Sequence, residues 1–413
     1  MPYLRHALRI LILWAALAAL FTAGICLSQT LGENKRVLDN AVASLKIIDS
    51  EGQYPARTVL KAVFENFTDA LMISAATAPP NDGETLVETA FAARCSFGEY
   101  GERPLTVAQK ALASIADDDY SGYAPYGRYW HGYLLTLRPA LYFTDIKGMR
   151  AVNAAVLCAL VLAALGATWR RVGLGPTLCL SAALAVVWTW YVPDSLMYCT
   201  CFFIALGFYT WLMAAPPRWL SDDRCALIFF TIGALTSYFD LLSTPLITFG
   251  LPVTAPLLRR KRMPDYRFLI GCLALWCAGY AGLWATKWLL TALFTPLELM
   301  ESTLAQIRLR TTPVIMATDG LIPPKALWMV KRAAALAALT VIAALIAYCR
   351  GRQAQMVRYS SFAVLASLPV LWALALQDHS FIHVWFVWRI GLVSVLGCLL
   401  FIFYTFKTSH HPS

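Results

Sequence analysis

The strongest constraint on this chain is a series of long apolar runs separated by short charged turns. A helix needs about 20 mostly apolar residues to cross the hydrocarbon core of a membrane. Charged residues make up only 14% of the chain, against about 25% in soluble domains. The sequence therefore predicts an all-α polytopic membrane protein with about ten transmembrane helices. The predicted spans cover residues 8–28, 151–168, 175–191, 196–214, 225–243, 244–258, 267–291, 333–349, 360–376 and 384–406.

Two regions of this pattern have an alternative interpretation. The first run follows a cationic start, as a cleaved signal peptide would. Its ~20 apolar residues are long for a signal peptide, and no clear cleavage site follows, so we take it as a true span. The stretch 225–258 is apolar almost throughout. We divide it at Leu242–Pro245, because proline interrupts a helix.

Positive residues in the short loops give the orientation, because Lys and Arg are retained on the cytoplasmic side. If the spans alternate, most of these residues fall on one side: Arg5, Arg9, Arg170, Arg171, Arg218, Arg224, Arg259, Arg260, Lys261, Arg262, Arg350, Arg352, Arg358 and Lys407. We expect that side to be the cytoplasm, with both termini in it and the chain in a bacterial inner (cytoplasmic) membrane. The net charge of +10 is then an orientation signal, and no nucleic-acid partner is expected.

The outer face receives two larger segments, which divide the chain into five parts. These are the N-terminus with the first span (1–28), an outer domain (29–150), spans two to seven (151–291), a second outer loop (292–332), and the last three spans with the C-terminus (333–413). Apolar periodicity in the outer segments predicts helices at 33–49, 56–76, 84–95, 105–117 and Pro296–Leu309. The outer domain is therefore expected to be mainly helical.

One outer stretch, YGRYWHGYLLTLRP from Tyr126 to Pro139, places rings and cations just before the second span. Arginine offers a planar fork to phosphate oxygens, and histidine offers a donor whose charge changes near neutral pH. Other His and Arg residues are predicted at the same outer level. A phosphate- or donor-binding ring would comprise Arg128, His131, Arg138, His379, His383 and Arg389. Interface anchoring is the alternative, because Trp, Tyr and Arg are enriched at membrane surfaces.

Two carboxylates interrupt apolar surroundings. Asp69 lies on an apolar-faced helix of the outer domain, where partial burial would raise its pKa and favour base chemistry. Alternatively, it is an ordinary helix residue. Asp240 lies near the outer end of span five, and an ionisable residue inside a membrane is a functional candidate. Its alternative is a structural pairing, with Lys287 of span seven as the partner.

A histidine pair, His379 and His383, is spaced so that both side chains share one face of a helix. With Asp378 they would form a divalent-metal site, and they would equally bind a phosphate. The sequence indicates no further ligand. A divalent metal ion is therefore the only cofactor to consider, and it is not firmly predicted.

Four stretches carry a resemblance to a known family: Glu65–Met72, Tyr126–Pro139, Thr236–Pro245 and His379–Arg389. With a large first outer loop, a carboxylate in that loop and cations on the outer face, the chain resembles the GT-C superfamily of membrane glycosyltransferases. It is similar to bacterial membrane proteins of that general plan over most of its length. GT-C enzymes commonly carry an acidic pair or an Asp-x-Asp motif close after the first span, and this chain departs from that pattern.

The resemblance implies transfer of a sugar from a polyprenyl phosphate to a glycan, lipid or protein acceptor on the outer face, among membrane lipids. Asp69, or in second place Asp240, would deprotonate the acceptor hydroxyl. The cationic ring would offset the charge on the departing phosphate, and the lipid tail would lie in a groove between spans. The rings predicted to stack on sugar faces are Tyr126, Tyr129, Trp130 and Tyr133.

Two other classes of function stay open. A transporter or flippase of a lipid-linked or anionic substrate would place ionisable residues near the bilayer midplane and often repeat one half of its fold in the other. Only Asp240 and Lys287 qualify, and no repeat is visible. A non-catalytic envelope assembly protein would tolerate Asp69→Asn and His383→Ala, whereas an enzyme would lose turnover and keep its fold.

Overall fold

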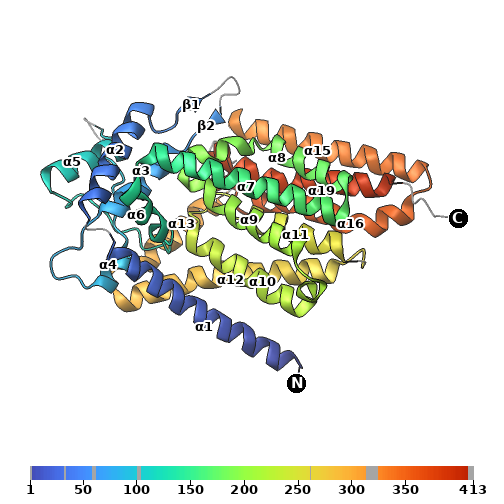
Figure 1. The fold of residues 1–413 in the computed structure, drawn as a ribbon, viewed down its shortest axis with the longest axis horizontal. Coiled ribbons are helices and arrows are strands. Elements are labelled where there is room, and N and C mark those ends of the chain that lie inside the picture. The colour runs from blue at the N-terminus through green and yellow to red at the C-terminus, as the bar shows by residue number, and fades with distance from the viewer. Residues whose placement is uncertain are drawn as a thin grey trace.

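The structure is a computed structural model that describes residues 2–31, 34–57, 62–99, 104–260, 262–312 and 324–407. Within these ranges the regular structure is helical, apart from one short antiparallel pair of strands, β1 (Ala56–Arg57) and β2 (Ala62–Val63), in which Ala56 is paired with Val63. Long helices lie side by side, and shorter helices gather at one end of them (Figure 1). With this small exception, the prediction of an all-α fold is confirmed.

Each of the ten predicted spans falls on a helix of the long bundle. These helices are α1 (Pro2–Gln29), α7 (Ile146–Val172), α8 (Leu174–Val186), α9 (Leu196–Ala214), α10 (Asp222–Phe239), α11 (Leu246–Arg259), α12 (Tyr266–Phe294), α15 (Pro324–Cys349), α16 (Gln353–Ala375) and α19 (Gly391–Phe406). Apolar runs of this length form helices in a membrane because a helix satisfies all of its backbone hydrogen bonds internally.

The number of spans is a separate question. Six segments are long and apolar enough to cross a membrane: Leu4–Gln29, Ile146–Val172, Leu196–Ala214, Tyr266–Phe294, Gln353–Ala375 and Val384–Phe406. Three further apolar helices are shorter, and α11 has only 14 residues. At ~1.5 Å per residue, such a helix reaches about 21 Å, less than the ~30 Å of a hydrocarbon core. The described residues thus contain six candidate spans, and the predicted count of ten is not confirmed.

The break predicted at Leu242–Pro245 is confirmed. Helix α10 ends at Phe239, and α11 begins at Leu246. Between them, the backbone of Leu242 is left-handed, with a φ of 65°. Because Pro245 has no amide hydrogen to donate, it cannot continue the preceding helix. The break leaves the carbonyl of Leu242 free to accept a hydrogen bond from another part of the chain.

The shorter helices at one end of the bundle lie in residues 29–150, the segment predicted to face outward, for which we keep the name outer domain. They are α2 (Lys35–Glu51), α3 (Asn66–Thr77), α4 (Leu86–Ala92), α5 (Val107–Asp117) and α6 (Leu134–Phe143). Three of the four helices predicted here lie within a few residues of the observed bounds. Helix α6 was not predicted, because its apolar residues resemble the approach to the next span.

The predicted helix at 56–76 is wrong in its first half. That half contains the two strands, and the helix begins only at Asn66. The amide of Phe64 donates to the carbonyl of Pro55 (3.1 Å) and closes a hairpin before α3. Pro55 disfavours a continuous helix, and β-branched Val63 favours extended backbone.

A buried ionic network fastens the outer domain to the bundle. Arg150, near the start of α7, donates from Nη1 to Oε1 of Glu51 (2.9 Å) and from Nη2 to Oδ1 of Asn66 (3.0 Å). The amide nitrogen of Asn66 returns a bond to Oε2 of Glu51 (3.0 Å). The three residues therefore join the end of α2, the start of α3 and the start of α7.

Candidate functional site

The predicted site residues lie in three places in the described structure. Arg128, His131 and their aromatic neighbours form a loop that leads into α6. His379 lies on the short helix α17 (Gln377–Ile382), His383 in the turn before α18 (Val384–Val387), and Arg389 on η3 (Trp388–Ile390). The carboxylates Asp69 and Asp240 lie on α3 and at the end of α10.

Arg138 joins two helix ends. Its side chain is buried, and its guanidinium donates to the carbonyls of Ser28 (2.6 Å), Ala76 (3.0 Å) and Ala75 (3.3 Å), and to the side chain of Gln29 (2.9 Å). Those carbonyls close α1 and α3, where the helix dipole favours a cation. Binding a phosphate would require several of these bonds to break, so Arg138 acts as a structural residue in this arrangement.

The His131 side chain also has a hydrogen-bond partner at each ring nitrogen. Its Nε2 lies 2.7 Å from the carbonyl of Tyr126, and its Nδ1 lies 2.9 Å from the hydroxyl of Tyr133. Burial lowers the pKa of His131 to about 3, so the imidazole is neutral at physiological pH. A neutral ring can donate only once, which assigns the proton to Nε2 and the bond from Tyr133 to Nδ1.

Of the four rings predicted to stack on sugars, only one is partly exposed. Tyr129, Trp130 and Tyr133 are buried, and the indole of Trp130 donates to the carbonyl of Leu283 on α12 (2.8 Å). Tyr126 is half-buried. The guanidinium of Arg128, also half-buried, lies 5.1 Å from the centre of the Tyr126 ring. Tyr126 and Arg128 are therefore the accessible members of this loop.

The His379 side chain is held between two bundle elements. Its Nε2 lies 3.0 Å from the carbonyl of Leu242, in the break between α10 and α11, and its Nδ1 lies 3.2 Å from Nη1 of Arg310. Arg310 belongs to α13 (Leu299–Thr311) in the second outer loop. Burial, followed by the charge of Arg310, lowers the pKa of His379 to about 3.

His383 has fewer hydrogen-bond partners than His379. The two rings lie 5.0 Å apart, and Nδ1 of His383 is buried without a hydrogen-bond partner. Burial, with Arg310 adding to it, lowers the pKa of His383 to about 4. Among the described residues, no group of three His, Cys, Asp or Glu side chains could hold a metal ion.

The Asp240 carboxylate closes the break after α10. Both of its oxygens accept from the amide of Ser243 (3.1 and 3.0 Å), and the Ser243 hydroxyl also donates to it. The alternative pairing with Lys287 is not formed. Nζ of Lys287 instead donates to the carbonyl of Phe91 (2.9 Å) and lies 4.3 Å from the centre of the Phe91 ring.

The Asp69 carboxylate is completely buried and caps a helix. Its oxygens accept from the amides of Leu196 (3.0 Å) and Met197 (3.2 Å), at the start of α9. Burial raises the pKa of Asp69 to about 7, although the charge of Arg150 opposes the shift. The role of general base predicted for Asp69 would compete with this capping role.

One buried carboxylate was missed by the sequence analysis. Glu65 accepts from the indole of Trp385 on α18 (2.6 Å) and from the hydroxyl of Thr68 (2.9 Å). Burial raises the pKa of Glu65 to about 7, against the effect of these two bonds. The available signal was its position four residues before Asp69, which places two acidic side chains on one face.

Around α17, several buried polar atoms have no partner among the described residues. Native proteins leave few such atoms unpaired, so a concentration of them marks a place for a polar ligand. Arg389 is 1% exposed; its Nη1 donates to the carbonyl of Trp385 (3.1 Å), while its Nε is unpaired. The hydroxyl of Ser380 is unpaired too. We use the name outer polar cluster, after the face on which it is predicted to lie, for Arg310, His379, Ser380, His383 and Arg389.

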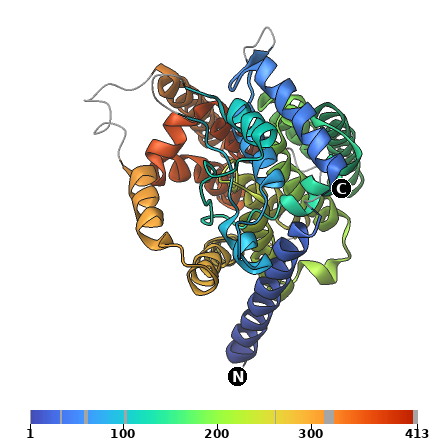
Figure 2. The same ribbon diagram turned by 90° about the vertical axis from the view of Figure 1, so that its left-hand side faces the viewer.

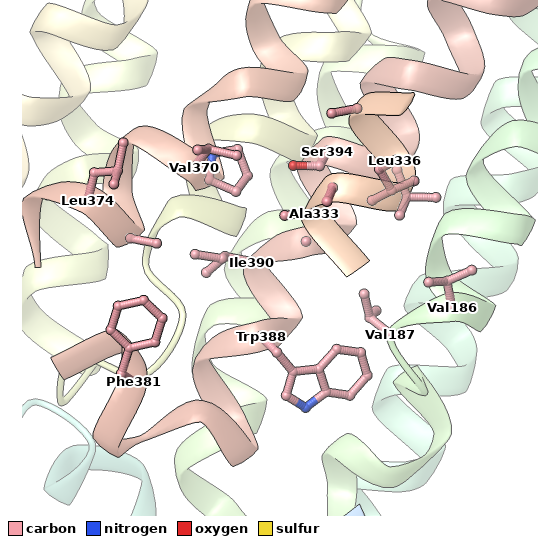
Figure 3. A pocket seen from close by; sticks show the side chains of 16 residues that line it. Val186, Val187, Ala333, Leu336, Val370, Leu374, Phe381, Trp388, Ile390 and Ser394 are labelled. Atoms are coloured by element: carbon pink, nitrogen blue, oxygen red, sulfur yellow. The ribbon is translucent and has the colours of Figure 1, made fainter. Parts of the chain in front are cut away.

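An apolar pocket of about 460 Å³ lies beside this cluster. Figure 3 shows side chains from four regions pointing into it, among them Val187, Leu336, Val370 and Ile390. Ser394 is the exception to the apolar lining, and its hydroxyl bonds the carbonyl of Ala366 (2.8 Å). Such a lining suits a hydrocarbon chain and offers little to a polar solute.

Residues that line the pocket are the direct sequence neighbours of cluster residues at two places in the chain. Phe381 and Trp388 line the pocket, while their neighbours Ser380 and Arg389 belong to the cluster. The Arg389 guanidinium lies 5.3 Å from the Trp388 ring and 4.3 Å from the Tyr198 ring. A polar region rich in donors thus adjoins an apolar region.

Comparison of the chain with known protein families, with curated proteins and with solved structures finds no match in any of the three. The structure brings His379 and His383 together, ties His379 to the break that Asp240 closes, and adds Arg310. In the structure, Arg138 and His131 make hydrogen bonds within other parts of the fold and do not join this cluster. What this site does is therefore inferred from its own chemistry.

The hydrogen bonds of Arg138 and of Arg128 predict that replacing the two residues lowers the free energy of unfolding by different amounts. Arg138→Met would remove a buried cation from at least three acceptors, each such bond being worth about 1.5–3 kcal/mol. We expect a loss of several kcal/mol and a clear fall in the thermal unfolding midpoint in detergent. Arg128→Met, at a half-buried side chain in the loop before α6, is the control and should shift the midpoint little. Equal midpoints for the two variants would contradict the assignment.

The raised pKa of Glu65 predicts a pH-dependent stability. The group binds its proton more tightly in the folded chain, so its burial costs stability increasingly as the pH rises from about 4.5 to about 7. Glu65→Gln removes the charge, and its amide can still accept from Trp385 and donate to Thr68. The variant should therefore match the wild type at pH 4.5 and exceed it in unfolding midpoint at pH 8. A variant that is less stable at pH 8 would contradict the shift.

Proposed function

We propose that this chain is a membrane glycosyltransferase of the GT-C type, which moves a sugar from a polyprenyl phosphate to an acceptor at the outer face. The observation that carries the proposal is that Phe381 and Trp388, which line the apolar pocket, directly adjoin Ser380 and Arg389 of the outer polar cluster in the chain. A polyprenyl phosphate has the matching shape, with an anionic head and a long hydrocarbon chain. On this proposal the phosphate lies against Arg310, His383 and Arg389, and the chain enters the pocket.

The charge balance around the cluster supports an anionic ligand. Neither Arg310 nor Arg389 forms a salt bridge with a carboxylate among the described residues, and Arg128 nearby also lacks one. Burial raises the pKa of Asp378 and the charge of Arg310 opposes that shift, so this carboxyl balances Arg310 in part. A phosphate would give the two guanidinium groups charge-assisted hydrogen bonds, which are stronger than neutral ones. It would also give the unpaired Nδ1 of His383 an acceptor once that ring is protonated at this nitrogen.

Three carboxylates compete for the role of general base: Glu65, Asp69 and Asp240. The oxygens of Asp69 hold backbone amides of α9, and those of Asp240 hold its own turn. Glu65 is held by the side chain of Trp385 and by Thr68, its own neighbour on α3, and it caps no other helix. Its indole partner Trp385 contacts His383 at a ring distance of 5.4 Å. We therefore place Glu65 first and keep Asp69 and Asp240 as the other candidates.

The proposed step balances without a co-reactant. The carboxylate takes the proton of the acceptor hydroxyl as the hydroxyl oxygen forms a bond to the anomeric carbon. The bond from that carbon to the phosphate oxygen breaks, and its electron pair leaves with the polyprenyl phosphate. The cationic groups would stabilise the charge that develops on this leaving group. The half-buried ring of Tyr126 is the accessible surface on which a sugar face would stack.

Two neighbouring arginines of α13 test the phosphate assignment. Arg310 bonds His379, whereas Arg308 is exposed and makes no side-chain contact with the cluster. Arg310→Met should weaken binding of a polyprenyl monophosphate in lipid nanodiscs by at least tenfold, the equivalent of one charge-assisted bond. Arg308→Met, as the matched control, should leave the dissociation constant within twofold. Equal effects of both variants would reduce the result to general surface charge and contradict the site.

Measuring turnover tests whether Glu65 is the general base. With a panel of polyprenyl-phosphate hexoses and pentoses, wild-type release of polyprenyl phosphate should rise with pH through about 7, as the Glu65 carboxyl loses its proton. Glu65→Gln should abolish this rise and lower the rate by at least a hundredfold, while its affinity for polyprenyl phosphate is retained and its unfolding midpoint is not lowered. If Glu65→Gln keeps the wild-type rate, the base is another carboxylate. If no donor turns over, the proposed reaction is wrong.

A further inference from the structure

Helix α13 lies next to the edge of the membrane. Only residues 295–298 separate it from Phe294, the last residue of α12, and α12 is one of the six candidate spans. The final turns of α12 expose Leu289 and Leu293 at 69% each. In a membrane protein, side chains exposed in this way face lipid. A helix that begins after so short a connection must therefore lie close to the bilayer surface.

The two sides of α13 make different contacts. Leu299 and Thr303 are buried against the protein, and α13 packs on α17. Arg310 points to the same side and bonds His379. These three residues are spaced by four and seven positions, which places them on one face of a helix.

A second face of α13 is apolar and uncovered. Met300, Leu304 and Ile307 are 61%, 46% and 42% exposed, and their spacing of four and three positions makes a continuous stripe along the helix. The remaining surface carries exposed Glu301 and Arg308, together with Leu309, which is 53% exposed. The stripe lies between the protein-facing side and the charged side, where a helix lying flat in a membrane interface would meet the acyl chains.

The orientation of the helix agrees with this pattern. Figure 2 views the molecule along its long axis, and there α13, in orange, is seen from the side at the edge of the molecule. Long helices of the bundle such as α19, in red, are seen closer to end-on. Helix α13 thus runs across the direction in which the bundle extends.

We propose that α13 is an interfacial helix whose Met300–Leu304–Ile307 stripe lies among the acyl chains of the outer leaflet, and that this position holds Arg310 against His379. The occupant of the stripe is phospholipid, because the exposed apolar surface continues onto it from the lipid-facing end of α12. Contact with the bilayer thereby places one cation of the outer polar cluster. This inference does not depend on the chemistry of sugar transfer.

Photo-crosslinking tests the contact directly. The full-length protein, in nanodiscs of phosphatidylethanolamine and phosphatidylglycerol, would carry benzoylphenylalanine at position 304 or 307, and in the controls at position 301 or 305 of the same helix. We expect phospholipid adducts at 304 and 307 at least tenfold above those at 301 and 305, measured by intact mass. Equal labelling at all four positions would overturn the proposal. Adducts to a second copy of the chain, in place of lipid, would assign the stripe to a protein interface and also overturn it.

Amide hydrogen exchange over residues 299–311 tests the consequence for Arg310. Leu304→Glu with Ile307→Glu should raise the exchange rate of this segment in nanodiscs at least tenfold and weaken polyprenyl monophosphate binding as Arg310→Met does. Ala305→Glu, on the opposite face, is the matched control and should leave both unchanged. An unchanged thermal midpoint separates local release from unfolding. Unchanged exchange in the double variant would overturn the proposal, and a failed turnover assay alone would leave it standing.

Discussion

The candidate site depends on one interhelical contact, between α3 and the start of α9, which we call the α3–α9 joint. The carboxylate of Asp69 accepts two backbone amides there, at Leu196 and Met197, which would otherwise be unpaired at a helix N-terminus. Beside it, the amide of Glu65 donates to the hydroxyl of Ser195 (3.0 Å), and the Glu65 side chain reaches α18. Because these bonds are buried, the outer domain cannot shift without losing several of them. The joint therefore fixes α3, α9 and α18 around the outer polar cluster.

The second constraint is the burial of cations without carboxylate partners. A buried charge costs free energy unless hydrogen bonds compensate for its lost hydration. Arg138 meets that need with three carbonyls and an amide oxygen, and Lys287 with a carbonyl and a ring. Arg389 has one carbonyl bond, two ring contacts, a side-chain bond with Tyr198 and an unpaired Nε. Arg389 therefore keeps a donor for an anionic ligand and, unlike Arg150, whose Nε is also unpaired, has no carboxylate partner among the described residues.

Apolar periodicity was sufficient to predict most of the fold. The runs coincide with bundle helices, and the proline at 245 located a real break. The site was predicted less well, because the sequence does not show whether the hydrogen-bond donors of an arginine are all paired within the fold. Arg138 and Arg389 look alike in the sequence, yet the guanidinium of Arg138 bonds the ends of two helices and that of Arg389 keeps an unpaired Nε.

The residues that were missed depend on contacts between distant parts of the chain. Glu65 meets Trp385 across 320 positions, and Arg310 meets His379 only because α13 folds back onto α17. No local pattern specifies either pairing. The helix of Arg310 was predicted at Pro296–Leu309, but its periodicity does not reveal which of its arginines would turn toward the protein.

The central claim is that the outer polar cluster and the apolar pocket together hold a lipid with an anionic phosphate head. Native mass spectrometry of the protein, extracted from bacterial membranes in mild detergent, tests it most directly. The account predicts a bound species with the mass of a polyprenyl phosphate, either bare or bearing a sugar whose mass identifies the donor class. Recovery of bulk phospholipid alone, from cells that contain polyprenyl phosphates, would contradict it.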